Sequence, residues 1–236
     1  MPAKLFIIPS TLGDTASIET IPPATLTALQ RLEHLIVETP KQARQFLRTA
    51  GIRLHERRIS FYTLDEHTAA AEVARLLAPA LSGSDIGLLS DAGCPAVADP
   101  GAALVRLAHE RGIPVIPLVG PSSITLALMA SGLNGQRFSF HGYLPVELKA
   151  LKDSIRLLEH RASAENQTQV FIEAPYRNDR LFAAILDTCA PQLLLCLATD
   201  LTLTSQSIAT RSVERWRTER PVLNRRPTVF LLGPPG

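Results

Sequence analysis

The sequence has 236 residues, of which 46% are hydrophobic and 19% are charged, and its net charge is only +2. This composition is typical of a packed α/β protein, excludes a disordered chain and gives no strong overall attraction to nucleic acid. No apolar stretch approaches the ~20 residues that span a bilayer. Three widely spaced cysteines show no metal-ligand spacing and suit a reducing compartment. We therefore expect a cytoplasmic protein that contacts no membrane and holds no metal.

Apolar runs and helical patterns alternate along the first part of the chain. In chain order they predict strands over 5–9, 34–37, 58–64, 85–89, 115–118 and 138–141, and helices over 24–31, 41–50, 67–77, 102–111 and 124–130. Glycines follow several of these helices, as they do at helix ends. The alternation indicates βαβ units around a mostly parallel sheet.

The composition changes after Pro145, where a more charged helix is predicted over 148–160. A second helix, 178–189, and strands over 169–173, 193–198, 206–211 and 228–232 follow it. The sequence therefore predicts two α/β domains, residues 1–144 and 145–236.

The most informative segment is the small-residue loop 90–101, which connects the strand 85–89 to the helix 102–111. Ligands of open α/β sheets bind at the carboxyl ends of strands, and small residues let them come close to the backbone. The loop contains Asp91 and Asp99 but no Lys or Arg, so it suits a cation or a ribose-bearing ligand better than a phosphate. A simple turn that uses Gly93 and Gly101 for positive φ explains the loop equally well.

Three further segments, 115–123, 131–133 and 138–145, follow this loop in a recognisable order. Together the four motifs resemble the tetrapyrrole methylase superfamily of S-adenosylmethionine-dependent methyltransferases. The chain is most similar to the branch that methylates a ribose 2′-hydroxyl of small-subunit ribosomal RNA, and the resemblance runs from Pro9 to Leu232. It implies two unlike α/β domains with the cofactor in the cleft between them, RNA as a partner and a homodimer.

The resemblance implies S-adenosylmethionine as the cofactor and places its contacts in both domains. The implied cofactor-binding residues are Ser90, Asp91, Ala92, Gly93, Cys94, Pro95, Asp99, Pro121, Ser122, Ser123, Tyr143, Pro227 and Thr228. Considered alone, Ser122 and Ser123 are more often helix caps. Tyr143 has two interpretations, packing on the ligand or on the core, and the core is slightly favoured.

Two segments resemble substrate-side motifs of the family. They are the turn 9–14, with Pro9, Gly13 and Asp14, and the segment 173–177, with Glu173 and Arg177. A plain turn and a surface ion pair are the alternatives. A general base would assist a ribose hydroxyl. Asp14, Asp91, Glu173 and His141 are available for this role, but each has a simpler explanation, so we leave the catalytic base unassigned.

The substrate side departs from the ribosomal branch in two places. Residues 38–44 lack its aspartate and displace its arginine, and residues 199–203 lack its charged pair. Two basic runs, within 41–58 and 211–226, are expected to be solvated faces more often than an RNA surface. Three functions stay open: methyl transfer to RNA, methyl transfer to a small molecule such as a tetrapyrrole, and cofactor binding without catalysis. Missing motifs disfavour dehydrogenases, ATPases, hydrolases and metalloproteases.

Overall fold

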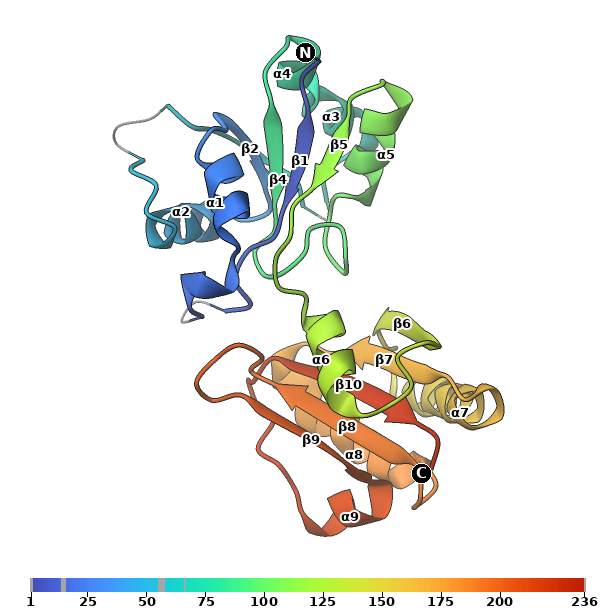
Figure 1. Cartoon of the computed structure of the whole chain (residues 1–236). Helices are drawn as coiled ribbons and strands as arrows, with labels where there is room; N and C mark the ends of the chain where they lie inside the picture. The colour runs from blue at the N-terminus through green and yellow to red at the C-terminus, as the bar shows by residue number, and fades with distance from the viewer. Residues whose placement is uncertain (1, 14–15, 55–57, 66, 236) are drawn as a thin grey trace. The chain divides into compact units, whose positions relative to one another are not determined.

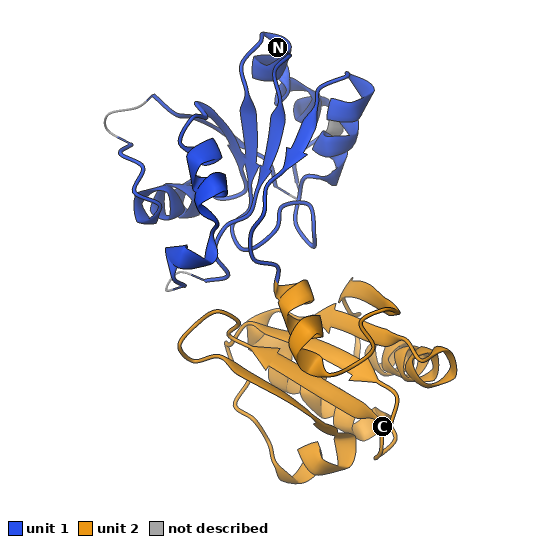
Figure 2. Cartoon of the chain, viewed as in Figure 1, with its two compact units in different colours: residues 1–122 blue, residues 123–236 orange. Residues whose placement is uncertain are grey.

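The computed structural model describes residues 2–13, 16–54, 58–65 and 67–235. The chain divides into two compact units, Met1–Ser122 and Ser123–Gly236 (Figures 1 and 2). Within the described residues, no helix combines the length and the apolar character that a membrane span requires.

The first unit is built on a five-stranded sheet in which every pairing is parallel. Its strands are β1 (Leu5–Ile8), β2 (His34–Val37), β3 (Ser60–Thr63), β4 (Ile86–Leu89) and β5 (Val115–Pro117). Their order is β3-β2-β4-β1-β5, so that β4 lies between β2 and β1. All four residues of β4 are buried, as expected for a central parallel strand that is covered on both faces.

Helices cover both faces of this sheet (Figure 1). On one face α1 (Pro23–Leu29) and α2 (Pro40–Thr49) enclose a core with the side chains of Ile8, Leu35 and Leu89. On the other face lie α3 (Ala70–Arg75), α4 (Ala78–Leu81) and α5 (Ala102–Glu110). A short 3-10 helix, η1 (Ile18–Thr20), precedes α1. The helix expected over 67–77 is thus shorter, Ala70–Arg75, and a separate short helix with Pro79 in its first turn follows it.

The second unit is built on a mixed five-stranded sheet, ordered β6-β7-β10-β8-β9. Only β6 and β7 pair in parallel. The elements in chain order are α6 (Ser123–Ser131), β6 (Phe138–Tyr143), α7 (Leu148–Glu165), β7 (Thr168–Ile172), η2 (Pro175–Arg177), α8 (Asn178–Thr188), β8 (Leu194–Thr199), β9 (Ser207–Ser212), α9 (Val213–Thr218) and β10 (Thr228–Gly233). Helices α7, α8 and α9 share one core with Phe171 and Phe230, whose stacked rings lie 5.8 Å apart.

The division between the units differs from the boundary that the sequence places after Leu144. Helix α6 contacts β10, β8 and β9, and the hydroxyl of Thr210 donates a hydrogen bond of 2.6 Å to the carbonyl of Ser131. Strand β6 pairs with β7, with Phe138 opposite Thr168. Residues 123–144 therefore belong with the sheet that follows them.

Candidate functional site

The loops that follow β1 and β4 meet at the carboxyl end of the first sheet. The two strands are parallel neighbours, with Ile8 opposite Leu89, so the turn 9–14 and the loop 90–101 begin at the same edge. The backbone N–H of Ser10 donates a hydrogen bond of 2.9 Å to the carbonyl of Gly93. The structure thus joins the predicted substrate-side turn to the predicted cofactor loop. Asp14 of that turn lies outside the described residues.

Two glycines allow three segments to pack closely at this edge. A Cβ on Gly93, whose φ is +72°, would lie 3.0 Å from Leu12 Cδ2 and 3.6 Å from the carbonyl oxygen of Pro121. A Cβ on Gly120 would lie 2.4 Å from Pro9 Cβ. The segment 119–122 therefore joins the turn and the loop, and it brings Pro121 and Ser122 to the same place.

The backbone of the loop 90–101 is unusual for a simple turn. Besides Gly93 and Gly101, two residues with side chains, Ala96 and Ala98, have positive φ angles of 64° and 60°. Such conformations cost on the order of 1–2 kcal/mol each in L-residues and persist where the surroundings impose them, often at functional sites. This backbone favours a ligand-binding loop over a turn chosen only for its connectivity.

The two carboxylates of the loop have different surroundings. Asp91 Oδ1 accepts a hydrogen bond of 3.2 Å from the backbone N–H of Thr39 at the start of α2, which leaves its second oxygen available for a ligand. Asp99 accepts a short hydrogen bond from the hydroxyl of Ser90. Burial raises the pKa of Asp99, and the negative charge of Asp91 adds to this effect, although the Ser90 bond opposes it.

Cys94 connects the loop to the segment 119–122. Its thiol lies 3.5 Å from the carbonyl oxygen of Pro121, to which it donates a weak hydrogen bond. Burial raises the pKa of Cys94, and the neighbouring charge of Asp99 acts in the same direction. The thiol therefore stays protonated near neutral pH and acts as a packing group instead of a nucleophile.

Sequence reasoning missed the contribution of α2 to this edge. A small pocket there is lined by residues of α2, of the turn and of the loop: Ser10, Thr11, Gly13, Ala16, Gln42, Gln45, Phe46, Thr49 and Asp91. The signal was the strand order, because β2 lies directly beside β4 although α2, β3, α3 and α4 separate them in the chain. That order cannot be read from the periodicity of a single sequence.

In the second unit, three predicted residues lie at one end of the sheet. Tyr143 pairs with Ile172 at the ends of β6 and β7, Glu173 follows β7, and the antiparallel β10 begins there with Thr228. Tyr143 is 58% exposed, so the slight preference for core packing was wrong for this residue. Ser123 is the first residue of α6.

Glu173 and Arg177 form a well-defined ion pair in the second unit. Nε and Nη2 of Arg177 lie 2.9 and 2.6 Å from Glu173 Oε1. Glu173 is only 8% exposed, so the pair is more buried than the surface ion pair considered from the sequence. Thr228 uses its hydroxyl internally, 3.1 Å from that of Thr199, and the carbonyl of Pro227 accepts a hydrogen bond from the N–H of Asp200.

The residues considered as general bases have other partners. His141 Nε2 lies 2.8 Å from Gln169 Oε1, Glu173 holds Arg177, and Asp91 holds the start of α2. Asp14 lies outside the described residues. The geometry therefore supports leaving the catalytic base unassigned.

Comparison with known proteins shows similarity over almost the whole chain. A family model described as "Tetrapyrrole (Corrin/Porphyrin) Methylases" matches residues 5–215. Ribosomal RNA small subunit methyltransferase I of Escherichia coli O157:H7 is 32% identical over 205 residues, which cover 87% of this chain and 68% of that protein. The Vibrio cholerae protein of the same name is 33% identical over 86% of this chain and 67% of its own length. The chain thus spans about two thirds of these two relatives.

Solved structures share the fold at lower sequence identity. The methyltransferase CobJ superposes with a TM-score of 0.64 and 18% identity, covering 98% of this chain and 94% of its own. A uroporphyrin-III C-methyltransferase from Thermus thermophilus, complexed with S-adenyl homocysteine, gives a TM-score of 0.57 and 16% identity over 98% and 97% of the two chains. These structures confirm the two-unit α/β fold class that the sequence predicts.

Replacement of Gly93 by valine should weaken binding of S-adenosylmethionine. A β-branched residue at φ +72° is strained, and its Cβ would lie only 3.0 Å from Leu12 Cδ2. We expect at least a tenfold lower affinity by isothermal titration calorimetry, with a lower melting temperature. Gly135→Val is the matched control, because nothing lies within 4 Å of a Cβ there. Unchanged affinity in Gly93→Val would remove this loop from the cofactor site.

Asp99→Asn should alter the pH dependence of stability. Because the pKa of Asp99 is raised in the folded chain, the folded state keeps this proton to higher pH, and the stability so gained is lost as pH rises through the folded pKa. The asparagine variant cannot ionise, so its free energy of unfolding relative to wild type should increase as the pH rises above about 4, the ordinary pKa of an aspartate. Urea denaturation across this range measures the difference. The exposed carboxylate of Asp153 provides the control, Asp153→Asn, and an equal pH profile in both variants would contradict the prediction.

Proposed function

The chain belongs to the tetrapyrrole (corrin/porphyrin) methylase family, and we propose that it transfers the methyl group of S-adenosylmethionine to RNA of the small ribosomal subunit. It is an S-adenosylmethionine-dependent methyltransferase. We propose also that the acceptor is a ribose 2′-hydroxyl of this RNA.

The choice of substrate rests on the contrast between the proteins that are similar in sequence and those that are similar in fold. Relatives named as ribosomal RNA methyltransferases are 32% and 33% identical over most of this chain. Methyltransferases named for tetrapyrrole substrates share the fold at 15–20% identity. A fold hosts many substrates, so the sequence similarity is the stronger guide.

The residues at the carboxyl end of the first sheet suit the cofactor. S-adenosylmethionine supplies a methyl group on a positively charged sulfur, and its ribose offers two hydroxyls. Asp91 provides a carboxylate oxygen that can accept a hydrogen bond from such a hydroxyl, and Gly93 keeps side-chain atoms away from the backbone. The cofactor-binding role of the loop 90–101, of Pro121 and Ser122, and of Ser123, Tyr143, Pro227 and Thr228 in the second unit is proposed on this basis.

Methyl transfer makes modest demands on side chains. The acceptor oxygen displaces the sulfur at the methyl carbon, so alignment of the two reactants supplies much of the rate. The rigid joining of the turn 9–14 to the loop 90–101, through Ser10 and Gly93, is suited to that task. The buried Glu173–Arg177 pair is proposed to shape the substrate side in the second unit.

We expect the purified chain to transfer labelled methyl groups from S-adenosylmethionine to an unmodified transcript of small-subunit ribosomal RNA, or to small ribosomal subunits that lack the modification. Nucleoside mass spectrometry should find a ribose-methylated product, and uroporphyrinogen offered in parallel should stay unlabelled. Gly93→Val serves as the inactive control. Label in uroporphyrinogen instead of RNA would favour the small-molecule enzyme. Cofactor binding with no transfer to either acceptor would favour a non-catalytic protein.

We infer further that the chain acts as a homodimer in the cytoplasm. The three cysteines are unpaired, which suits a reducing compartment. The edge strand β6 and the segment after it expose apolar side chains, including 46% of Phe138 and 53% of Val146.

Light scattering should therefore give about twice the 25.6 kDa of one chain. Phe138→Glu should shift the mass toward the monomer, because it places a charge on the exposed apolar edge of β6. Tyr176→Glu, at a residue that is 71% exposed elsewhere in the unit, should leave the mass unchanged. A monomeric wild type would contradict the inference.

A further inference from the structure

The arginines of the C-terminal basic run are largely engaged in bonds within the second unit. Arg211 and Arg215 both pair with Glu219, and the guanidinium of Arg211 lies 4.6 Å from the centre of the Trp216 ring. Arg226 donates to Asp200 at 2.8 Å and to the carbonyl of Ser205 at 2.7 Å.

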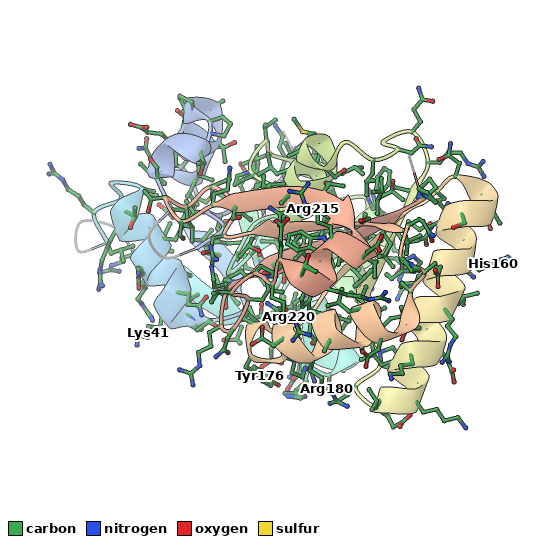
Figure 3. The ribbon with its side chains drawn as sticks, turned by 90° about the horizontal axis from the view of Figure 1, so that it is seen from below. Lys41, His160, Tyr176, Arg180, Arg215 and Arg220 are labelled. Carbon is green, nitrogen blue, oxygen red and sulfur yellow. The ribbon has the colours of Figure 1, made fainter. Side chains whose placement is uncertain are left out.

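Arg217 of the same run donates to the carbonyls of Leu186 and Cys189. Figure 3 shows Arg215 on α9 and Arg220 in the segment after it. Four of the six arginines are therefore paired or hold α9 and the following loop in place, and the exposed Arg220 and Arg225 remain as charges that a polyanion could reach.

The basic run on α2 has a different environment. Lys41, Arg44 and Arg48 follow one another at intervals of three and four residues, so they form one stripe along the helix. All three are exposed, and none has an acidic partner among the described residues. The helix contains no Asp or Glu. Figure 3 shows Lys41 at the start of this helix.

Packing keeps the stripe on the surface. Ala43, Phe46 and Leu47 bury the opposite side of α2 against the sheet, so the helix cannot rotate its charges inward. The guanidinium of Arg44 lies 4.7 Å from the centre of the Phe61 ring on β3, a contact that orients the group without neutralising it.

The stripe adjoins the candidate cofactor site. Thr39, directly before α2, donates its backbone N–H to Asp91 of the loop 90–101. Gln42, Gln45 and Thr49 line the pocket that also includes Ser10 and Asp91. One flank of α2 therefore presents amides and a hydroxyl to the site, and the neighbouring flank presents three positive charges to solvent.

We propose that α2 is the RNA-binding helix of this enzyme: Lys41, Arg44 and Arg48 contact successive backbone phosphates, and Gln42, Gln45 and Thr49 contact the sugar edge of the nucleotide that enters the site. This inference rests on the proposed function and names the surface that binds its substrate. The stripe spans ~10 Å along the helix, too long for one phosphate group and suited to a chain of them.

The exposed side of α2 distinguishes RNA from a tetrapyrrole. The acidic substituents of a macrocycle could also bind cations, but its ring would pack on apolar side chains, and every exposed residue of α2 from Lys41 to Thr49 is charged or polar. RNA instead offers phosphates to cations and 2′-hydroxyls to amides.

The test measures RNA affinity as a function of salt concentration. The triple variant K41Q/R44Q/R48Q should reduce the magnitude of the slope of log affinity against log salt by about 2, because each lost phosphate contact removes about 0.7 in single strands. This change corresponds to about 50-fold weaker binding at 0.15 M salt. The probe is the unmodified transcript of small-subunit ribosomal RNA, and the KM for RNA should rise while the affinity for S-adenosylmethionine stays constant.

The matched control is R215Q/R220Q/R225Q, which removes three exposed positive charges from the C-terminal run. It should bind the transcript like wild type. If the wild type methylates RNA but the α2 variant binds the transcript as tightly as wild type, the inference is overturned and the proposed function stands. A loss of RNA affinity confined to the control variant would have the same meaning. Displacement of the transcript by uroporphyrinogen would overturn the inference too. A wild type that bound the cofactor but no RNA would instead remove the proposed function and the inference together.

Discussion

The parallel pairing of β1 with β4 is the constraint on which the candidate site depends. It fixes the carboxyl ends of both strands at one edge, and the hydrogen bond from Ser10 to Gly93 then joins the two segments that leave them. The strands themselves are buried and apolar, and the chemistry lies in the loops. The strain at Ala96 and Ala98 is tolerated there because the strand before the loop and α5 after it are firmly packed.

The sequence predicts the local elements well, because apolar periodicity and glycine ends determine them locally. The loop 90–101 is found for the same reason, whereas the segment 119–122 is singled out by the family resemblance. The sequence reading fails where the answer depends on which strands become neighbours. Strand β6 looks like the last strand of the first domain, yet it pairs with β7, and α2 lies beside the loop only because β2 is next to β4.

Side-chain roles show the same limit. Core packing is slightly favoured for Tyr143 from its place in the sequence, but this residue ends the edge strand β6 and is exposed. Glu173 and Arg177 resemble a substrate-side motif, with a surface ion pair as the alternative, but burial of the carboxylate makes the pair structural as well. The two arginine-rich runs, within 41–58 and 211–226, look equivalent in the sequence. Glu219 and Asp200 pair with arginines of one run. Among the described residues, no carboxylate pairs with Lys41, Arg44 or Arg48 of the other.

Under the proposed role of α2, fold and substrate are encoded in different residues of this chain. CobJ superposes on almost all of it with only 18% identity, so the fold tolerates wide sequence change. Ala43, Phe46 and Leu47 anchor α2, and on its outer side Arg44 contacts the Phe61 ring. The outer residues can therefore change with the substrate at less cost in stability than the buried ones. A polar, cationic side of α2 beside the proposed cofactor edge is consistent with a fold that serves different substrates in one family.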